Sequence, residues 1–77
     1  MPMRAGTRTM QGDAARQRIL SFIRVFEKEH SYMPNLVEIA DGTAMFRNSV
    51  RFHLEILRRA EKVAYTDGMM ARTLRLL

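Results

Sequence analysis

The hydrophobic residues between positions 13 and 30 recur three and four residues apart, which is the spacing of one face of an α-helix. The members of this apolar face are Ala15, Ile19, Phe22, Ile23 and Phe26. Asp13 is suited to be the N-cap, because its carboxylate would lie at the positive end of the helix dipole. Pro34 disfavours helical backbone at Met33, so we expect this first helix to end before the proline.

A second, short helix is predicted from Asn35, which stands three residues before Glu38 in the manner of a capping box. The helix should continue through Ile39 and Ala40. We expect it to end at Gly42, because glycine readily adopts the left-handed conformation that closes helices.

A third helix is predicted over residues 49–61, with Asn48 or Ser49 as its N-cap. One stripe of this helix carries Val50, Leu54, Leu57 and Glu61, with His53 and Ala60 at its edge. Phe52 and Ile56 are four residues apart and form a second apolar strip on the flank. Two positions for Phe52 stay open: exposed to a partner, or packed against the second helix.

The last part of the chain is predicted to form a β-hairpin. Residues 63–66 have the β-branched and aromatic character of a strand, and Asp67–Gly68 is a strong turn dipeptide. Residues 72–76 alternate, so that Leu74 and Leu76 would share one face of a second strand.

This order of elements predicts a mainly α fold with a small β-hairpin (α+β). It is the order of a winged helix-turn-helix, with three helices and a C-terminal wing, in which the third helix enters the major groove. Residues 13–77 would form this domain. Residues 1–12 are predicted to be a flexible basic arm, either contacting phosphate or the minor groove or serving as a disordered leader.

The composition changes this picture in two ways. The 77 residues include no cysteine, which excludes disulfide scaffolds and cysteine-ligated metal sites. The net charge of +5 favours an anionic partner, most often nucleic acid. Eleven of the thirteen basic residues are arginine, which fits bidentate contacts to phosphate and guanine but also a GC-rich genome.

The sequence gives no case for an enzyme, a cofactor or a metal site. His30 and His53 have no suitably spaced third ligand, and we expect His53 to be a helix-edge residue. No apolar run is long enough to span a membrane, and residues 1–12 lack the apolar core of a secretory signal. We therefore expect no membrane partner and a cytoplasmic or nucleoid location in a bacterium.

Four motifs in order resemble the N-terminal DNA-binding domain of LexA-type repressors over residues 13–77. They are Tyr32-Met33-Pro34, Glu38-Ile39-Ala40, His53-Leu54-Glu55-Ile56-Leu57 and Arg72-Thr73-Leu74-Arg75-Leu76-Leu77. The resemblance implies a winged helix-turn-helix fold and binding to double-stranded DNA. Asn48 matches the asparagine that the family places near the entry of its recognition helix.

The sequence differs from the family pattern at several positions, and these differences limit which family properties can be expected of this protein. The family's acidic base-contacting residues are replaced by Arg51 and Phe52, so its operator sequence should not apply. Its Leu-Gly pair after the second helix is replaced by the Asp-Gly-Thr-Ala-Met of residues 41–45. Because nothing follows Leu77, we expect the family's self-cleaving protease domain to be absent.

The candidate DNA contacts lie on the third helix, the turn before it and the wing. They are Arg47, Asn48, Ser49, Arg51, Phe52, Glu55, Arg58, Arg59, Arg72 and Arg75. Asn48 would pair with adenine or act only as an N-cap, and Arg51 would contact guanine, a phosphate or solvent alone. Glu55 would accept from cytosine or form an i,i+4 ion pair with Arg51 or Arg59.

The remaining candidates divide between phosphate and apolar contacts. Ser49, Arg58 and Arg59 are expected at phosphates. If exposed, Phe52 would contact a thymine methyl group or a protein partner.

The main hypothesis is a small sequence-specific DNA-binding protein that regulates transcription, as a repressor. Useful specificity would favour a homodimer or adjacent copies. One alternative is an architectural or recombination factor of phage or plasmid type. Another is a protein-binding winged helix, such as a phage-encoded inhibitor of a host complex, which would use Phe52, Ile56, Met69 and Met70.

Overall fold

The computed structural model describes residues 2–68 and 70–77, with side chains for all of these except residues 2–11, 71 and 72. The elements in chain order are α1 (Pro2–His30), α2 (Leu36–Thr43), α3 (Arg47–Arg59), β1 (Val63–Ala64), α4 (Met70–Thr73) and β2 (Arg75–Leu76). The two strands pair antiparallel, with Val63 opposite Leu76 and Ala64 opposite Arg75. The chain is thus a small, mainly helical α+β domain.

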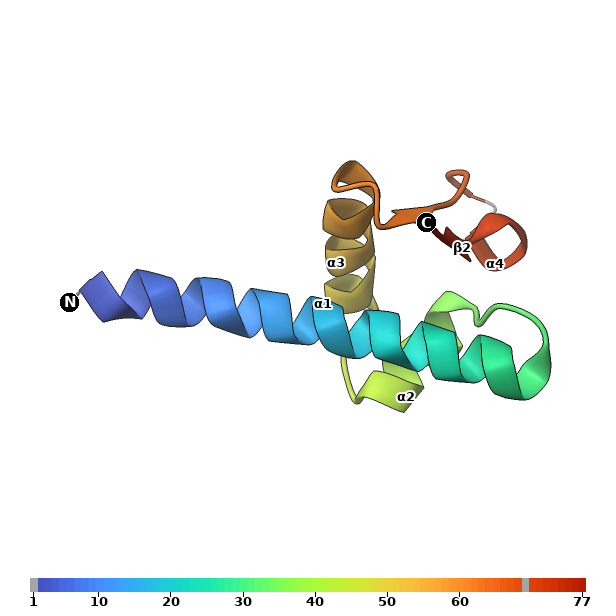
Figure 1. Cartoon of the computed structure of the whole chain (residues 1–77), viewed down its shortest axis with the longest axis horizontal. Helices are drawn as coiled ribbons and strands as arrows, with labels where there is room; N and C mark the ends of the chain where they lie inside the picture. The colour runs from blue at the N-terminus through green and yellow to red at the C-terminus, as the bar shows by residue number, and fades with distance from the viewer. Residues whose placement is uncertain (1, 69) are drawn as a thin grey trace.

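The three longer helices pack around one core, and the strand pair lies beside α3 (Figure 1). α1 crosses α3, and its N-terminal end extends beyond the other elements (Figure 1). The largest fully buried side chains include Ile19 and Ile23 of α1, Ile39 of α2, and Val50 and Leu54 of α3. Burying one side chain of this size stabilises the fold by about 1.5–3 kcal/mol relative to leaving it exposed. This shared core therefore holds the three helices against one another.

The apolar face predicted for the first helix is confirmed at its centre, because Ile19, Ile23 and Phe26 are buried. The predicted start at Asp13 is wrong. α1 begins at Pro2, and the backbone of residues 2–12 is helical in place of the flexible arm. Asp13 therefore lies inside the helix, where its carboxylate forms an ion pair with Arg16 at 2.8 Å. The division of the chain at residue 12 stays a prediction.

The capping box at the start of α2 is confirmed. The Asn35 side chain accepts from the backbone N–H of Glu38 at 2.8 Å, and the Glu38 carboxylate accepts from the Asn35 backbone N–H at 2.9 Å. The predicted role of Gly42 is wrong, because it lies within α2 and Ala44 is the residue in the left-handed conformation, at φ 57°. The helix continues to Thr43, whose buried hydroxyl donates to the Ile39 carbonyl at 2.7 Å, and the backbone N–H of Met45 closes it by donating to the Ala40 carbonyl at 3.0 Å.

The core face of the third helix is confirmed, since Val50, Leu54 and Leu57 are buried. Its predicted N-cap is wrong. Asn48 and Ser49 lie inside the first turn of α3, and the N-cap residue is Phe46, whose position carries no side-chain cap.

The predicted end of the third helix is also wrong. α3 ends at Arg59, and Glu61 lies beyond it in a left-handed conformation at φ 59°. The carbonyl of Leu57 accepts from the backbone N–H of Lys62 at 2.9 Å, which closes the helix before the first strand. Glu61 therefore does not belong to the apolar stripe.

The hairpin is confirmed, but its strands are shorter than predicted. The first strand covers only residues 63–64, and α4 replaces the first part of the predicted second strand at 70–73. The hydroxyl of Thr73 accepts from the backbone N–H of Thr66 at 2.7 Å. This bond joins the two ends of the segment between β1 and β2, which contains α4. Gly68 takes a positive φ of 77°, as the predicted turn requires. At the end of the chain, Leu77 N–H donates to the Lys62 carbonyl at 3.0 Å.

Candidate nucleic-acid interface

α3 presents an exposed face directly opposite the side that enters the core. The helical spacing that buries Val50 and Leu54 places Asn48, Phe52 and Arg59 on the far side, and all three are exposed. Because α1 and α2 pack against the buried side, this far side is the part of α3 that is open to a partner.

Three arginines of α3 combine exposure with the absence of an internal acidic partner. Arg47, Arg51 and Arg59 are exposed, and none of them forms an ion pair within the side chains that the structure describes. Arg75 on β2 is also exposed. Guanidinium groups in this state keep all five donors available for phosphate or base edges.

Arg58 differs from these arginines because its half-buried side chain is bound by acidic groups of the protein itself. Its guanidinium donates to both carboxylate oxygens of Glu55, the longer contact being 2.8 Å, and to the Asp67 carboxylate at 2.8 Å. It also lies over the Tyr65 ring, 4.4 Å from the centroid. Hydrogen bonds with Asp67 and then Glu55 raise the pKa of Arg58. Arg58 therefore connects α3 to the segment after β1.

This arrangement corrects the predicted pairing of Glu55. Its partner is Arg58, three residues on, whereas the sequence predicted an i,i+4 pair with Arg51 or Arg59. Two acidic groups beside α3, Glu55 and Asp67, both form ion pairs with this one guanidinium. Arg51 and Arg59 form no such pair within the described side chains, so their guanidinium groups are available to an external partner.

Two phenylalanines stand out from the surface of α3 and the turn before it. Phe46 is 85% exposed and Phe52 is 62% exposed. Packing of Phe52 against the second helix, one of the two predicted positions, is therefore wrong; its ring instead lies edge-on to His53, with centroids 5.4 Å apart. The sequence prediction missed Phe46, because it falls in a turn outside any hydrophobic period.

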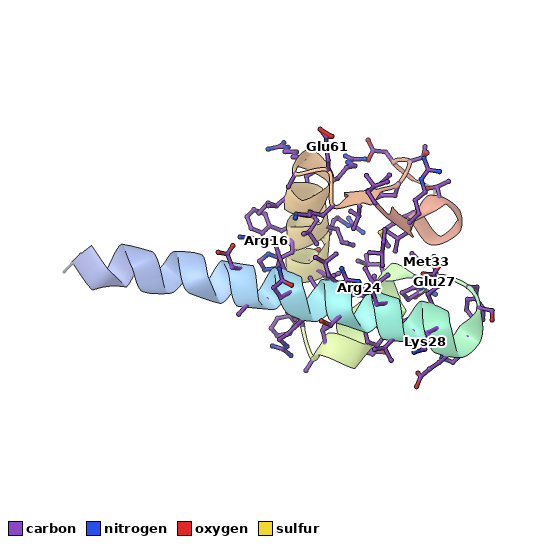
Figure 2. The ribbon with its side chains drawn as sticks, viewed as in Figure 1. Arg16, Arg24, Glu27, Lys28, Met33 and Glu61 are labelled. Carbon is purple, nitrogen blue, oxygen red and sulfur yellow. The ribbon has the colours of Figure 1, made fainter. Side chains whose placement is uncertain are left out.

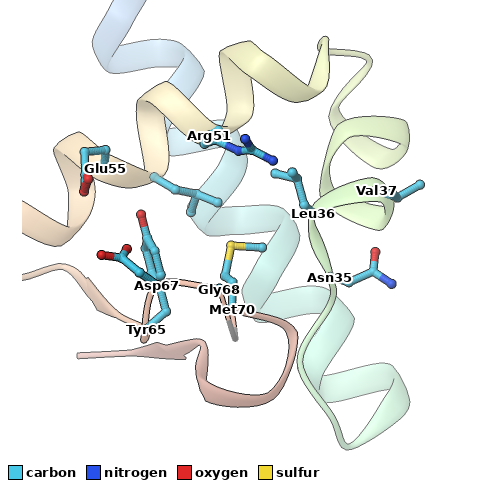
Figure 3. Close-up of a pocket in the computed structure, with 10 residues that line it drawn as sticks. Asn35, Leu36, Val37, Arg51, Glu55, Tyr65, Asp67, Gly68 and Met70 are labelled. Atoms are coloured by element: carbon cyan, nitrogen blue, oxygen red, sulfur yellow. The ribbon is translucent and has the colours of Figure 1, made fainter.

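A cleft of about 640 Å³ is lined by α3, the start of α2 and the segment after β1 (Figure 3). Leu36, Leu54, Tyr65 and Met70 supply its apolar lining. Figure 3 shows Arg51 extending from α3 toward Leu36 of α2, across the cleft. Arg51 therefore lies on the flank of α3 that borders the cleft, a quarter turn from Phe52.

The other predicted site residues fall in three groups. Ser49 is exposed in the first turn of α3 and is available to a partner. Ile56 and Met70 are half-buried, and Met70 lines the cleft, so neither forms a prominent apolar surface. Met69 and the side chain of Arg72 lie outside the described residues.

Two arginines of α1 connect this helix to α2 and α3. Arg18 donates to the Thr43 carbonyl at the end of α2. Arg16 lies on the part of α1 that crosses α3 (Figure 2), where its Nη1 is 3.3 Å from Nδ1 of His53. Burial, and then the Arg16 charge, lower the pKa of His53, which keeps the imidazole neutral and able to accept from Arg16.

Comparison with known proteins adds no relative. Neither a model of a known protein family nor a curated protein matches this sequence. The described helices also include none that is long and apolar enough to cross a membrane.

Proposed function

We propose that this protein binds double-stranded DNA as a small winged helix-turn-helix, with α3 in the major groove and the β1–β2 pair as the wing. The observation that carries the proposal is the exposed face of α3. Arg59 lies on the far side of α3, and Arg47 and Arg51 lie on its flank; all three are exposed and make no ion pair within the described side chains, whereas Arg58 pairs with Glu55 and Asp67.

The packing of α2 against α3 supports this role. α2 lies against the buried side of α3, and the three-residue turn 44–46 joins the two helices. In a helix-turn-helix, the first of the two helices supports the second while the second contacts base edges. Here the exposed positions Asn48 and Arg51 lie in the first two turns of α3, where such contacts are made.

The individual roles follow from residue chemistry. Asn48 is suited to pair with adenine and Arg51 with guanine or a phosphate. Ser49 and Arg59, with Arg75 on β2, are suited to phosphate oxygens. Arg58 is no longer proposed as a phosphate contact, because its donors already serve Glu55, Asp67 and the Tyr65 carbonyl. The biological role we propose is regulation of transcription, as a repressor of the LexA type.

Fluorescence anisotropy with a random genomic duplex pool, titrated at several salt concentrations, tests the proposal. The double variant Arg51→Gln/Arg59→Gln should bind at least tenfold more weakly and lower the salt slope by about 2. The matched control is Arg24→Gln/Lys28→Gln, which removes the same charge from exposed positions on α1. Figure 2 labels both control positions on α1.

The outcomes separate the alternatives. Equal losses in the two double variants would show that binding depends only on net charge and not on α3. No binding of the wild-type protein at low salt would remove the DNA proposal.

A second candidate function is binding to a protein partner. The 85% and 62% exposure of Phe46 and Phe52 favours it, since large exposed apolar side chains often mark protein interfaces. It would be preferred if the duplex pool fails to bind at low salt.

A further inference from the structure

The exposed surface around the start of α3 carries two kinds of side chain, aromatic rings and guanidinium groups. Phe46 and Arg47 are neighbours at its beginning, and Arg51 and Phe52 are neighbours one turn later. All four are exposed. A partner that covers this surface must satisfy aromatic rings and guanidinium groups together.

A hydrophobic protein groove would cover the rings at the cost of burying guanidinium groups without acidic partners. Nucleic acid offers both requirements, because it has an anionic backbone and flat base faces on which aromatic rings stack. In an intact duplex those faces are covered by neighbouring base pairs. Only unpaired or unstacked bases present them to a protein.

We infer that the α3 surface formed by Phe46, Arg47, Arg51 and Phe52 binds nucleic acid with unpaired bases, on which Phe46 and Phe52 stack. This inference rests on the assignment of DNA to α3 in the proposed function, and it changes the preferred target from a fully paired duplex to DNA with unpaired bases. It adds a stacking role for the two rings, beyond the thymine-methyl contact that Phe52 could make in the major groove of a fully paired duplex.

The spacing of the two rings sets the size of the site. Positions 46 and 52 are six residues apart, which corresponds to about 9 Å along a helix axis. Successive stacked bases rise about 3.4 Å along one strand. The two rings are therefore too far apart to stack on the same base.

The experiment compares three labelled DNA probes of equal length in the same buffer. They are a single strand, its fully paired duplex, and the same duplex with a central mismatched bubble. Binding to each is measured by anisotropy, with salt between about 50 and 200 mM. We expect the single strand and the bubble to bind about tenfold more tightly than the paired duplex.

The variants test the stacking directly. Phe52→Leu and Phe46→Leu keep an apolar side chain but remove the aromatic ring. Each should weaken binding to the single strand and the bubble about tenfold and change binding to the paired duplex by less than about threefold. Val25→Leu is the control, because Val25 is also exposed, at 53%, but lies on α1. Far-UV circular dichroism checks that every variant keeps its helical content.

The outcomes distinguish failure of the inference from failure of the proposed function. Paired duplex bound at least as tightly as the other probes, with no effect of either leucine variant, would overturn the inference and leave the proposed function standing. Binding of none of the three probes at low salt would overturn both. Equal weakening on all three probes would show that the rings make general apolar contacts and not stacking contacts, which also overturns the inference.

Discussion

The ring of Phe22 in α1 lies against the bare α-carbon of Gly42 in α2. A Cβ at position 42 would come within 3.0 Å of three ring carbons, closer than non-bonded carbons approach each other. Glycine is therefore required at position 42 because the Phe22 ring occupies the space of a side chain, and not because the backbone is left-handed.

This contact predicts that Gly42→Ala destabilises the protein. Alanine is the better helix former, so the substitution would otherwise stabilise α2 by about 0.5–1 kcal/mol. The clash with Phe22 should reverse the sign and cost about 1–3 kcal/mol in the free energy of unfolding. Urea denaturation measures this change.

A double-mutant cycle isolates the cause. In the Phe22→Ala background the ring is absent, so Gly42→Ala should become neutral or stabilising. If the alanine costs the same with and without the ring, the destabilisation has another origin.

The capping box gives a second prediction. Asn35→Ala removes the acceptor for the Glu38 backbone N–H and should lower the free energy of unfolding by about 1 kcal/mol. Asn35→Ser retains a capping oxygen and should lose only a few tenths of a kcal/mol. Equal losses in the two variants would mean that the asparagine acts through something other than its hydrogen bond.

Arg58 should hold the segment that follows β1 in one conformation. Arg58→Lys keeps the charge but loses the planar fork that contacts Glu55 and Asp67 together. We expect a lower melting temperature and faster amide hydrogen exchange at Thr66. The Asp67 side chain is 84% exposed, so solvent screens its ion pair with Arg58. Asp67→Asn should therefore lower the melting temperature less than Glu55→Gln does. Unchanged exchange at Thr66 in Arg58→Lys would argue against this role.

His53 should make stability depend on pH. Its pKa is lowered in the folded protein by burial and by Arg16, so the unfolded chain binds a proton more readily. The contribution to stability is complete above the ordinary histidine pKa of about 6.5 and is lost as the pH falls through the lower folded value. Thermal melts between pH of about 7.5 and 5.5 should show the decline.

Two variants identify the group responsible for that decline. His53→Gln removes the titrating imidazole and should flatten the profile in this range. Arg16→Gln removes the smaller of the two causes and should flatten it only in part. A profile that keeps its full slope in His53→Gln would assign the decline to other groups.

The parts of the fold that sequence predicts well are those governed by local or periodic rules. Ile19, Ile23, Val50 and Leu54 are buried as their spacing predicts, because a helix on a core buries one face. The capping box is right because all its hydrogen bonds lie within four residues. These rules do not need a tertiary neighbour.

The sequence predictions are wrong where a residue could fill two local roles and its tertiary contacts determine which one it fills. A glycine such as Gly42 is suited either to a left-handed helix end or to close packing against another helix. The ring of Phe22, twenty positions away, packs against it, so the second role applies here. Glu55 has three arginines at helical spacing, and Asp67 and Tyr65 position the one it binds. Phe46 has no periodic neighbour, so nothing in the sequence indicates its exposure.

The bond from the Leu77 N–H to the Lys62 carbonyl has a practical consequence for experiments on this protein. It brings the last residue next to the chain that has just left α3, at the end of that helix opposite Phe46. A fluorophore or surface tether joined after Leu77 would therefore start beyond the far end of α3. For immobilised binding assays, that is the attachment point which leaves Phe46, Arg47, Arg51 and Phe52 facing the solution.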